Sequence, residues 1–460
     1  MNLKLSFVFT VFFVCVSIAQ NGNPNDYLSA QFHKERREAL RAKMPQNSVA
    51  VFFGNPIRNR ANDVDFIYHQ DPDFYYLTGY KEPNSVLVIF SNNQTNKDGK
   101  SFNELLYVQE KNPRAEQWTG VRLGTEGAKK ELGFENAFDG SAFLNSGIDY
   151  ASFDTVFFKE FEEDTRNSKN EKADLYKLIG AFKSQIGYNE KVKSQVDSNV
   201  QNEINAKKSI TSKKATINTK SILTYMASLR EKKSKEELVL LTKAVRISAM
   251  GQREIMKAMH PGMSETEIQG IHEFVYKKYG SEFEGYPSIV GAGNNGCVLH
   301  YIENSKMKVE NELVLMDLGA EYHGYTADVT RTIPANGKFS MEQKLIYDLV
   351  YEAQEAGIAA IKIGNSFNAP DVAARKIISA GLLKLGIVKT EQESRKYFPH
   401  GTSHHIGLDV HDPGLYNAFE ADMVVTVEPG IYIPIGSDCD KKWWGIAVRI
   451  EDDILITTNG

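Results

Sequence analysis

Four carboxylates and one histidine in the C-terminal half of the chain are residue types that ligate metal ions. Asp317 and Glu428 each follow an apolar run, and Glu451 lies inside a third. Such runs are typical of strands with buried faces, where a bare carboxylate is strongly disfavoured unless a partner or a metal ion compensates its charge. Asp328 and His404 complete the set. Together the five residues favour a site for two metal ions.

Asp317 and Asp328 flank a predicted hairpin. Residues 312–332 predict two strands around a polar turn. If the turn centres between Tyr322 and His323, the two aspartates lie directly opposite each other, with Cβ atoms about 4.5–5.5 Å apart. That spacing suits carboxylates that hold two ions about 3.5–4 Å apart. An ordinary hairpin with one surface acid on each strand would explain this pair alone, but not the other three groups.

The run from Ile446 to Ile456 predicts a single strand that contains Glu451. Because side chains alternate between the two faces of a strand, Arg449 is expected on the same face as Glu451. We therefore expect this arginine to help hold the acid.

An ordered set of motifs resembles the pita-bread metallopeptidases, and among them the aminopeptidase P (Xaa-Pro aminopeptidase) family. The motifs in the C-terminal half are Ser288–Gly293, Asn295–Tyr301, MDLGAEYHGYTADVTRT from Met316, PHGTSHHIGLDVHD from Pro399, VEPGIY from Val427 and VRIEDD from Val448. In the N-terminal half, DFYYLTGYKEPNSVLVI from Asp73 and AEQWTGVRLG from Ala115 resemble that family's N-terminal domain. Any single block is weak evidence, whereas the ordered set is highly specific.

The resemblance implies two domains, which agrees with a length of 460 residues and 42% hydrophobic residues. An α/β N-terminal domain of the creatinase/prolidase type, with a polar linker, is expected at residues 20–215. An α+β pita-bread catalytic domain is expected at 216–460. Residues 48–53 and 85–90 predict strands, and the lysine-rich span 160–214 predicts polar helices and loops.

A long helix is expected at the start of the catalytic domain. Ser234 and Glu237 have the spacing of a capping box, and Ser264 and Glu267 repeat it after Pro261 ends the first helix. An apolar stripe follows helical spacing at Leu238, Leu241, Val245, Ala249, Ile255 and Met259. By the family pattern, these helices would cover the outer face of a curved sheet that carries the ligands on its concave side.

The resemblance also implies roles for the five ligands. Asp328 and Glu451 would bridge two divalent ions, Asp317 would complete the shell of one ion, and His404 with Glu428 that of the other. Oxygen ligands with one imidazole favour Mn²⁺, with cobalt, iron or zinc as substitutes. A hydroxide shared by the ions would attack the scissile carbonyl, and Glu428 would carry its proton to the departing proline nitrogen.

Three further histidines match family positions that line the pocket: His300, His400 and His411. There they would polarise the carbonyl or stabilise the tetrahedral intermediate. Taken alone, each would more often be an ordinary structural histidine. His405 has no counterpart in the family pattern and is expected to be structural, and His323 is expected to be a turn residue.

Other residues have weaker assignments. Arg449 and Tyr432 match positions close to the metals, where they would support the ligands. Trp118 matches a tryptophan that can approach a neighbouring subunit. Cys297 is expected to be a small buried residue near the site, and with Cys439 it cannot make a disulfide framework.

The first residues predict a signal peptide at 1–19. Lys4 precedes an apolar run, and Ser17-Ile18-Ala19 fits the small-x-small rule before cleavage. Lipidation at Cys15 is the alternative, but Val14 stands where a small residue is expected. The product would begin at Gln20 and be exported to the periplasm or the cell exterior, with no stable membrane span after cleavage.

Charge and resemblance define the expected partners. The net charge of −5 gives no basic footprint for nucleic acid. Proline-containing peptides are the implied substrates, and a homo-oligomer (dimer or tetramer) is implied by the family alone.

Four alternatives stay open. A prolidase would restrict the same chemistry to dipeptides, but the stretch from His300 to Asn304 and the N-terminal motifs favour aminopeptidase P. A methionine aminopeptidase shares the ligands but fits poorly with so large an N-terminal domain. A non-catalytic pita-bread binding module or a metal-free creatinase-type hydrolase would have lost ligands that this chain keeps.

Overall fold

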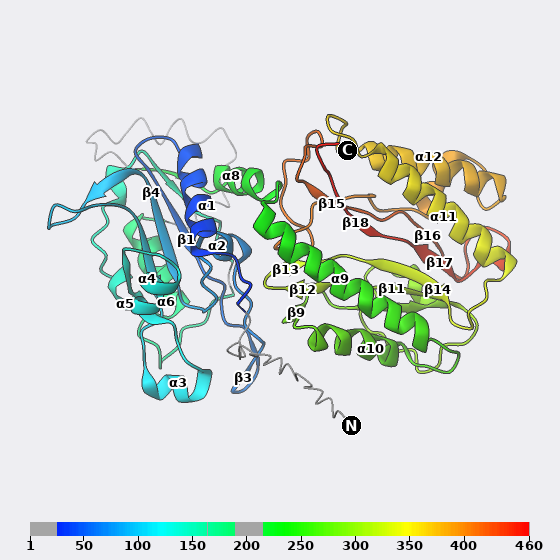
Figure 1. Ribbon diagram of the computed structural model, residues 1–460, viewed down its shortest axis with the longest axis horizontal. Coiled ribbons are helices and arrows are strands. Elements are labelled where there is room, and N and C mark those ends of the chain that lie inside the picture. Colours follow the sequence, from blue (N-terminus) through cyan, green and yellow to red (C-terminus); the bar gives the residue numbers. More distant parts are fainter. Residues whose placement is uncertain (1–24, 163, 189–214, 460) are drawn as a thin grey trace, which may run out of the picture.

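The computed structural model describes residues 25–162, 164–188 and 215–459. The chain forms an N-terminal and a C-terminal lobe, and helices α8 (Ser221–Arg230) and α9 (Lys235–Ala258) lead from one into the other (Figure 1). The predicted signal peptide at residues 1–19 and most of the predicted linker lie outside the described residues.

A mixed six-stranded sheet forms the centre of the N-terminal lobe, in the order β6-β5-β4-β1-β7-β8. Strand β4 pairs antiparallel with β1 and β5, whereas β6, β7 and β8 join their neighbours in parallel. The predicted strands at 48–53 and 85–90 are confirmed as β1 and the first part of β4. The six strands are β1 (Ser48–Phe53), β4 (Val86–Thr95), β5 (Ser101–Val108), β6 (Ala137–Asp139), β7 (Thr155–Phe157) and β8 (Thr216–Asn218).

Helices cover both faces of this sheet, because its central strands are apolar on both sides. Phe52 of β1 belongs to a core cluster with Phe32 of α1, and the neighbouring Val51 belongs to another with Phe182 of α6. The span 160–214 was predicted to be polar, and this prediction is wrong for α6, which adds to the core. The helices of the lobe are α1 (Ala30–Lys43), α2 (Pro72–Thr78), α3 (Pro113–Thr119), α4 (Gly124–Glu131), α5 (Gly140–Phe143) and α6 (Leu175–Gln185), and a two-stranded ribbon adds β2 (Asn59–Ala61) and β3 (Val64–Asp65).

The C-terminal lobe begins with α9, as predicted. The Ser234 side chain accepts a hydrogen bond from the Glu237 backbone N–H, and the Glu237 side chain accepts one from the Ser234 N–H, so the capping box is confirmed. At the second predicted box, Ser264 accepts from the Glu267 N–H at the start of α10 (Glu265–Lys278).

The buried face of α9 differs from the predicted apolar stripe. Leu241 is buried as expected, but Val245 is only partly buried and Ala249 is exposed. Ser248 and Gln252 face the interior instead. An apolar pattern could not identify this face, because part of it is polar and forms hydrogen bonds to the sheet.

The antiparallel strands of the C-terminal lobe form two halves, each with a pair of helices packed against it. Residues of α9 and α10 share a core cluster with β10 and β11, and residues of α11 and α12 share another with β16 and β17. The strands are β9 (Phe283–Glu284), β10 (Ile289–Ala292), β11 (Leu313–Asp317), β12 (Ala320–Tyr322), β13 (Tyr325–Thr326), β14 (Thr330–Pro334), β15 (Val424–Val427), β16 (Gly430–Ile433), β17 (Ile446–Arg449) and β18 (Asp452–Leu455), and the second helix pair is α11 (Met341–Ala360) and α12 (Ala369–Lys384).

A buried charge network joins the two lobes. Arg230, at the end of α8, donates to Asp73 of α2 at 2.6 Å and also to Asp412 of the C-terminal lobe. Lys233 donates to the other oxygen of Asp412 at 3.0 Å. All four side chains are at least 95% buried. Removing one partner of such a pair typically costs about 3–5 kcal/mol, so this network is a strong restraint on how the lobes meet.

Candidate active site

One cavity of about 570 Å³ in the C-terminal lobe contains all nine site residues named from the sequence. The apolar part of its wall includes Ile289, Leu299, Ile302 and Val410. The nine polar residues are Asp317, Asp328, His404, Glu428 and Glu451, the predicted ligands, and His300, His400, His411 and Arg449.

The first carboxylate pair comes from β11 and the segment before β14. Asp317 pairs with Thr330, so the prediction that it lies directly opposite Asp328 is wrong by two residues. The turn is centred on His323 and Gly324, which both have positive φ, rather than between Tyr322 and His323. The two carboxylates nevertheless lie close together, as shown by the Tyr286 hydroxyl, which is 2.6 Å from Oδ1 of each aspartate.

The second carboxylate pair lies at a break shared by two strand pairs. Strand β15 pairs with β18 (Val427 with Asp452), and β16 pairs with β17 (Gly430 with Arg449). The two ladders share one register, which places Glu428 opposite Glu451 at the break between them. The prediction of one strand from Ile446 to Ile456 is therefore wrong, because the ladder is interrupted at the ligand.

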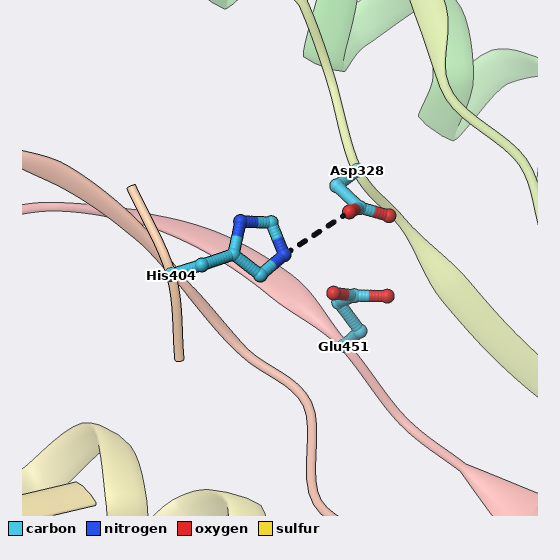
Figure 2. Close-up of side chains that lie close together, drawn as sticks. All are labelled: Asp328, His404 and Glu451. Atoms are coloured by element: carbon cyan, nitrogen blue, oxygen red, sulfur yellow. Dashed lines mark ion pairs between the residues drawn. The ribbon is translucent and has the colours of Figure 1, made fainter. Parts of the chain in front are cut away.

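His404 presents a free ring nitrogen to these carboxylates. Its Nδ1 lies 3.0 Å from the His405 carbonyl oxygen, which can only accept, so Nδ1 carries the proton. Its Nε2 lies 3.5 Å from Asp328 and 3.6 Å from Glu428. Figure 2 shows His404 facing Asp328 and Glu451, and one donor atom from each of these three lies within 4.8 Å of the others. With its proton on Nδ1, His404 is in the tautomer that leaves Nε2 free to ligate a metal ion.

Burial and mutual repulsion disfavour the ionised form of most carboxylates in this site. Burial, and then the neighbouring carboxylates, raise the pKa values of Asp328 and Glu451 well above their ordinary values. Burial raises the pKa of Glu428 to about 7. Burial acts in the same direction on Asp317, but the charge of Arg449 together with hydrogen bonds from Tyr286, Arg449 and Asp328 lowers the pKa of Asp317. Four carboxylates with one imidazole therefore fit divalent cations, which would relieve the repulsion.

Arg449 supports the ligands by a different route from the one predicted. Its Nη2 forms an ion pair with Asp317, and its Nε donates to Thr330 Oγ1 at 3.2 Å. Thr330 in turn donates to Glu451 at 2.5 Å. The arginine thus contacts Asp317 directly and reaches Glu451 through Thr330. Neither Thr330 nor Tyr286 was identified from the sequence, because hydroxyl groups beside ligands have no distinctive spacing.

The predicted pocket histidines lie around the same cavity. His400 Nδ1 lies 2.7 Å from the Gly401 carbonyl oxygen and so carries the proton, and its Nε2 accepts from the Tyr432 hydroxyl at 2.8 Å. That hydroxyl in turn accepts from Arg449 at 2.9 Å. His411 packs edge-on against His404, with ring centroids 4.5 Å apart, and His300 lines the mouth from an exposed position.

Three residues with other predicted roles lie outside the ligand set. His405 is buried between the rings of Phe367 and Tyr416. His323 is a turn residue as predicted, and it is buried as well. Cys297 was expected to be buried and is only partly so, but burial still raises the pKa of its thiol to about 12, which disfavours the reactive thiolate.

Comparison with known proteins identifies the family. Residues 239–458 match the model of metallopeptidase family M24, and residues 33–148 match the aminopeptidase P N-terminal domain. The Xaa-Pro aminopeptidase of Escherichia coli is 33% identical over 94% of both chains, and that of Haemophilus influenzae is 33% identical over 93% of this chain and 92% of its own. The chain belongs to metallopeptidase family M24.

Solved structures agree with this assignment. Aminopeptidase P from E. coli, in complex with the inhibitor Pro-Leu, superposes with a TM-score of 0.79 at 33% identity and covers 94% of this chain and 93% of its own. Aminopeptidase PepP of Pseudomonas aeruginosa gives a TM-score of 0.80 at 31% identity, covering 95% and 94%. The fold is thus the pita-bread fold with an aminopeptidase P N-terminal domain, and the protein is a metallo-aminopeptidase. Among the described residues, no helix is long and apolar enough to cross a membrane.

The Thr330 hydroxyl is a specific test of how the ligands are held. Thr330→Val keeps the shape of the side chain but removes the group that joins Glu451 to Arg449. Because such outer contacts typically contribute 10–100-fold to metal affinity, we expect binding of Mn²⁺ to the apoprotein, measured by calorimetry, to weaken by about that factor. Thr332→Val is the matched control. Thr332 lies on the same strand as Thr330, but its hydroxyl bonds the backbone of Arg449 and no metal ligand. Equal affinities in the two variants would contradict this role.

Proposed function

We propose that the protein is a dinuclear-metal aminopeptidase that hydrolyses the N-terminal Xaa-Pro bond of peptides. The observation that carries the proposal is the convergence of three buried carboxylates, the partly buried Glu428 and one imidazole protonated on Nδ1 around one cavity. The names of the curated relatives supply the substrate class.

The residues of the site can hold two ions in the arrangement expected from the family. Asp317, Asp328, His404, Glu428 and Glu451 would hold the ions. The oxygen-rich donor set with one imidazole favours Mn²⁺. When bound, the ions would supply a hydroxide nucleophile at neutral pH and polarise the scissile carbonyl.

The chain's own groups would manage the proton and the developing charge. Glu428 lines the cavity 3.6 Å from His404 Nε2, where it would take a proton from the attacking water and give it to the proline nitrogen. Burial lowers the pKa of His400 to about 4, so this ring is neutral at physiological pH. Its N–H faces the Gly401 carbonyl oxygen and its Nε2 faces the Tyr432 hydroxyl, so His300 and His411, which line the same cavity, would supply the N–H groups that bind the oxygen on which charge develops.

Proline specificity has a physical rationale. A bond to proline nitrogen has no N–H, and the ring fixes φ near about −65°. An enzyme that does not depend on that N–H can accept a bond that general aminopeptidases handle poorly. A prolidase remains the nearest alternative, and a non-catalytic peptide-binding module the remote one.

Peptide cleavage distinguishes these functions. We expect the chelated protein to be inactive and, after addition of Mn²⁺, to release the N-terminal residue from an Xaa-Pro-Pro tripeptide faster than from an Xaa-Pro dipeptide. Asp328→Ala should abolish both reactions, because it removes a shared ligand. Cleavage of the dipeptide alone would make the protein a prolidase, and cleavage of neither peptide after metal addition would exclude both enzymes.

We also propose that the protein is exported, on the basis of the apolar run and the Ser17-Ile18-Ala19 motif near its N-terminus. Expression of the full chain in a Gram-negative host should give a product that begins at Gln20 in the periplasm or the medium. Cell fractionation with N-terminal sequencing tests this. Recovery of the uncleaved chain from the cytosol would refute it, and a lipid on Cys15 would support the lipoprotein alternative.

Self-association is a further proposal, supported by apolar side chains on the surface of the N-terminal lobe. Trp118, on α3, is 86% exposed, and Val121 is 83% exposed. We expect a dimer or tetramer by light scattering, and weaker association in Trp118→Ala, because exposed apolar side chains of this size are typical of interfaces. A monomeric wild-type protein would contradict the proposal.

A further inference from the structure

A glutamine on α9 reaches the sheet directly behind the first carboxylate pair. Gln252 is only 3% exposed, and its Nε2 lies 3.1 Å from both the Met316 and the Val329 carbonyl oxygens. Met316 immediately precedes Asp317, and Val329 immediately follows Asp328. One side-chain amide therefore joins the backbones of both ligands.

A second glutamine, on α11, takes the corresponding position behind the other pair. Gln354 is 2% exposed, and its Nε2 lies 3.4 Å from the Val427 carbonyl oxygen and 3.0 Å from Asp452 Oδ2. Val427 immediately precedes Glu428, and Asp452 immediately follows Glu451. The two halves of the lobe thus repeat one arrangement, in which a helix glutamine binds beside both members of a ligand pair.

The orientation of these amides is fixed by their acceptors. Carbonyl and carboxylate oxygens accept hydrogen bonds, so the NH₂ end of each glutamine must face them. The Gln252 Oε1 atom is buried and has no partner among the described residues, which makes its side chain a costly choice for a core position. An apolar residue would fill the same space without burying an unpaired oxygen. The feature that distinguishes glutamine here is therefore its NH₂ group, which donates to the backbone beside the ligands.

We propose that Gln252 and Gln354 are positioning residues that hold the two ligand pairs at metal-binding separation from behind the sheet. The inference rests on the metal site proposed above. Neither side chain lines the cavity. Each acts through the backbone or side chain next to a ligand, at the end of the β11–β14 ladder for the first pair and at the break between the β15–β18 and β16–β17 ladders for the second.

The test is the affinity of the apoprotein for Mn²⁺, measured by calorimetry. Gln252→Met and Gln354→Met keep the length and volume of the side chain and remove only the amide. We expect each substitution to weaken Mn²⁺ binding about tenfold or more, the range typical of outer contacts to metal ligands. Because the two glutamines support different halves of the lobe, either variant tests the proposal if the other does not fold.

A third buried glutamine provides the matched control. Gln70 of the N-terminal lobe is 7% exposed and donates to the Tyr80 and Glu82 carbonyl oxygens, but it has no contact with a ligand. Gln70→Met should lose stability and keep wild-type Mn²⁺ affinity. If Gln252→Met and Gln354→Met bind Mn²⁺ as tightly as Gln70→Met does, the positioning role is refuted. If the wild-type protein itself binds no Mn²⁺, the proposed metal site falls, and this inference falls with it.

Discussion

Repulsion among four carboxylates in one buried cavity is the constraint on which the catalytic half of the molecule depends. Folding brings these groups together at the cost of their solvation, and the raised pKa values of Asp328, Glu428 and Glu451 express that cost. The protein compensates only part of it. Arg449 neutralises Asp317, and the hydroxyls of Tyr286 and Thr330 donate to the acids, while a divalent cation would supply the rest.

The lobe meets this constraint twice with the same design. In each half, two ligands lie at or just beyond the end of a strand ladder, a helix pair covers the sheet, and a glutamine binds beside both ligands. At the second pair the break in the ladder directs the Glu428 and Glu451 backbone N–H groups to Thr402 and Thr330, so these two ligands do not bond each other through the backbone. Side chains outside the cavity therefore have to fix the ligand spacing.

The N-terminal lobe is also connected to the site. Asp412, which accepts hydrogen bonds from Arg230 and Lys233, is the residue after His411 and lies in the loop that also carries His404. Arg230 binds Asp73 of the N-terminal lobe at the same time. The buried charges between the lobes thus restrain the backbone of the histidine loop as well as the relative placement of the lobes.

Local patterns in the amino-acid sequence were sufficient for the strands at 48–53 and 85–90, for the cap of α9 at Ser234 and for the acids that follow or interrupt apolar runs, whereas the pocket histidines were assigned only by the family resemblance. Capping and strand formation depend on near neighbours, and an acid beside an apolar run is conspicuous because it needs compensation. The pairing register of the strands and the side chains that hold the ligands could not be predicted from local patterns. The turn, with positive φ at His323, is centred one residue later than expected, so Asp317 pairs with Thr330 instead of Asp328. A break at Glu451 divided one expected strand.

The buried face of α9 and the roles of Thr330, Tyr286 and the two glutamines likewise depend on contacts between residues far apart in the chain. A hydroxyl or amide gains its function from the backbone it meets, and that meeting exists only after the helices pack against the sheet.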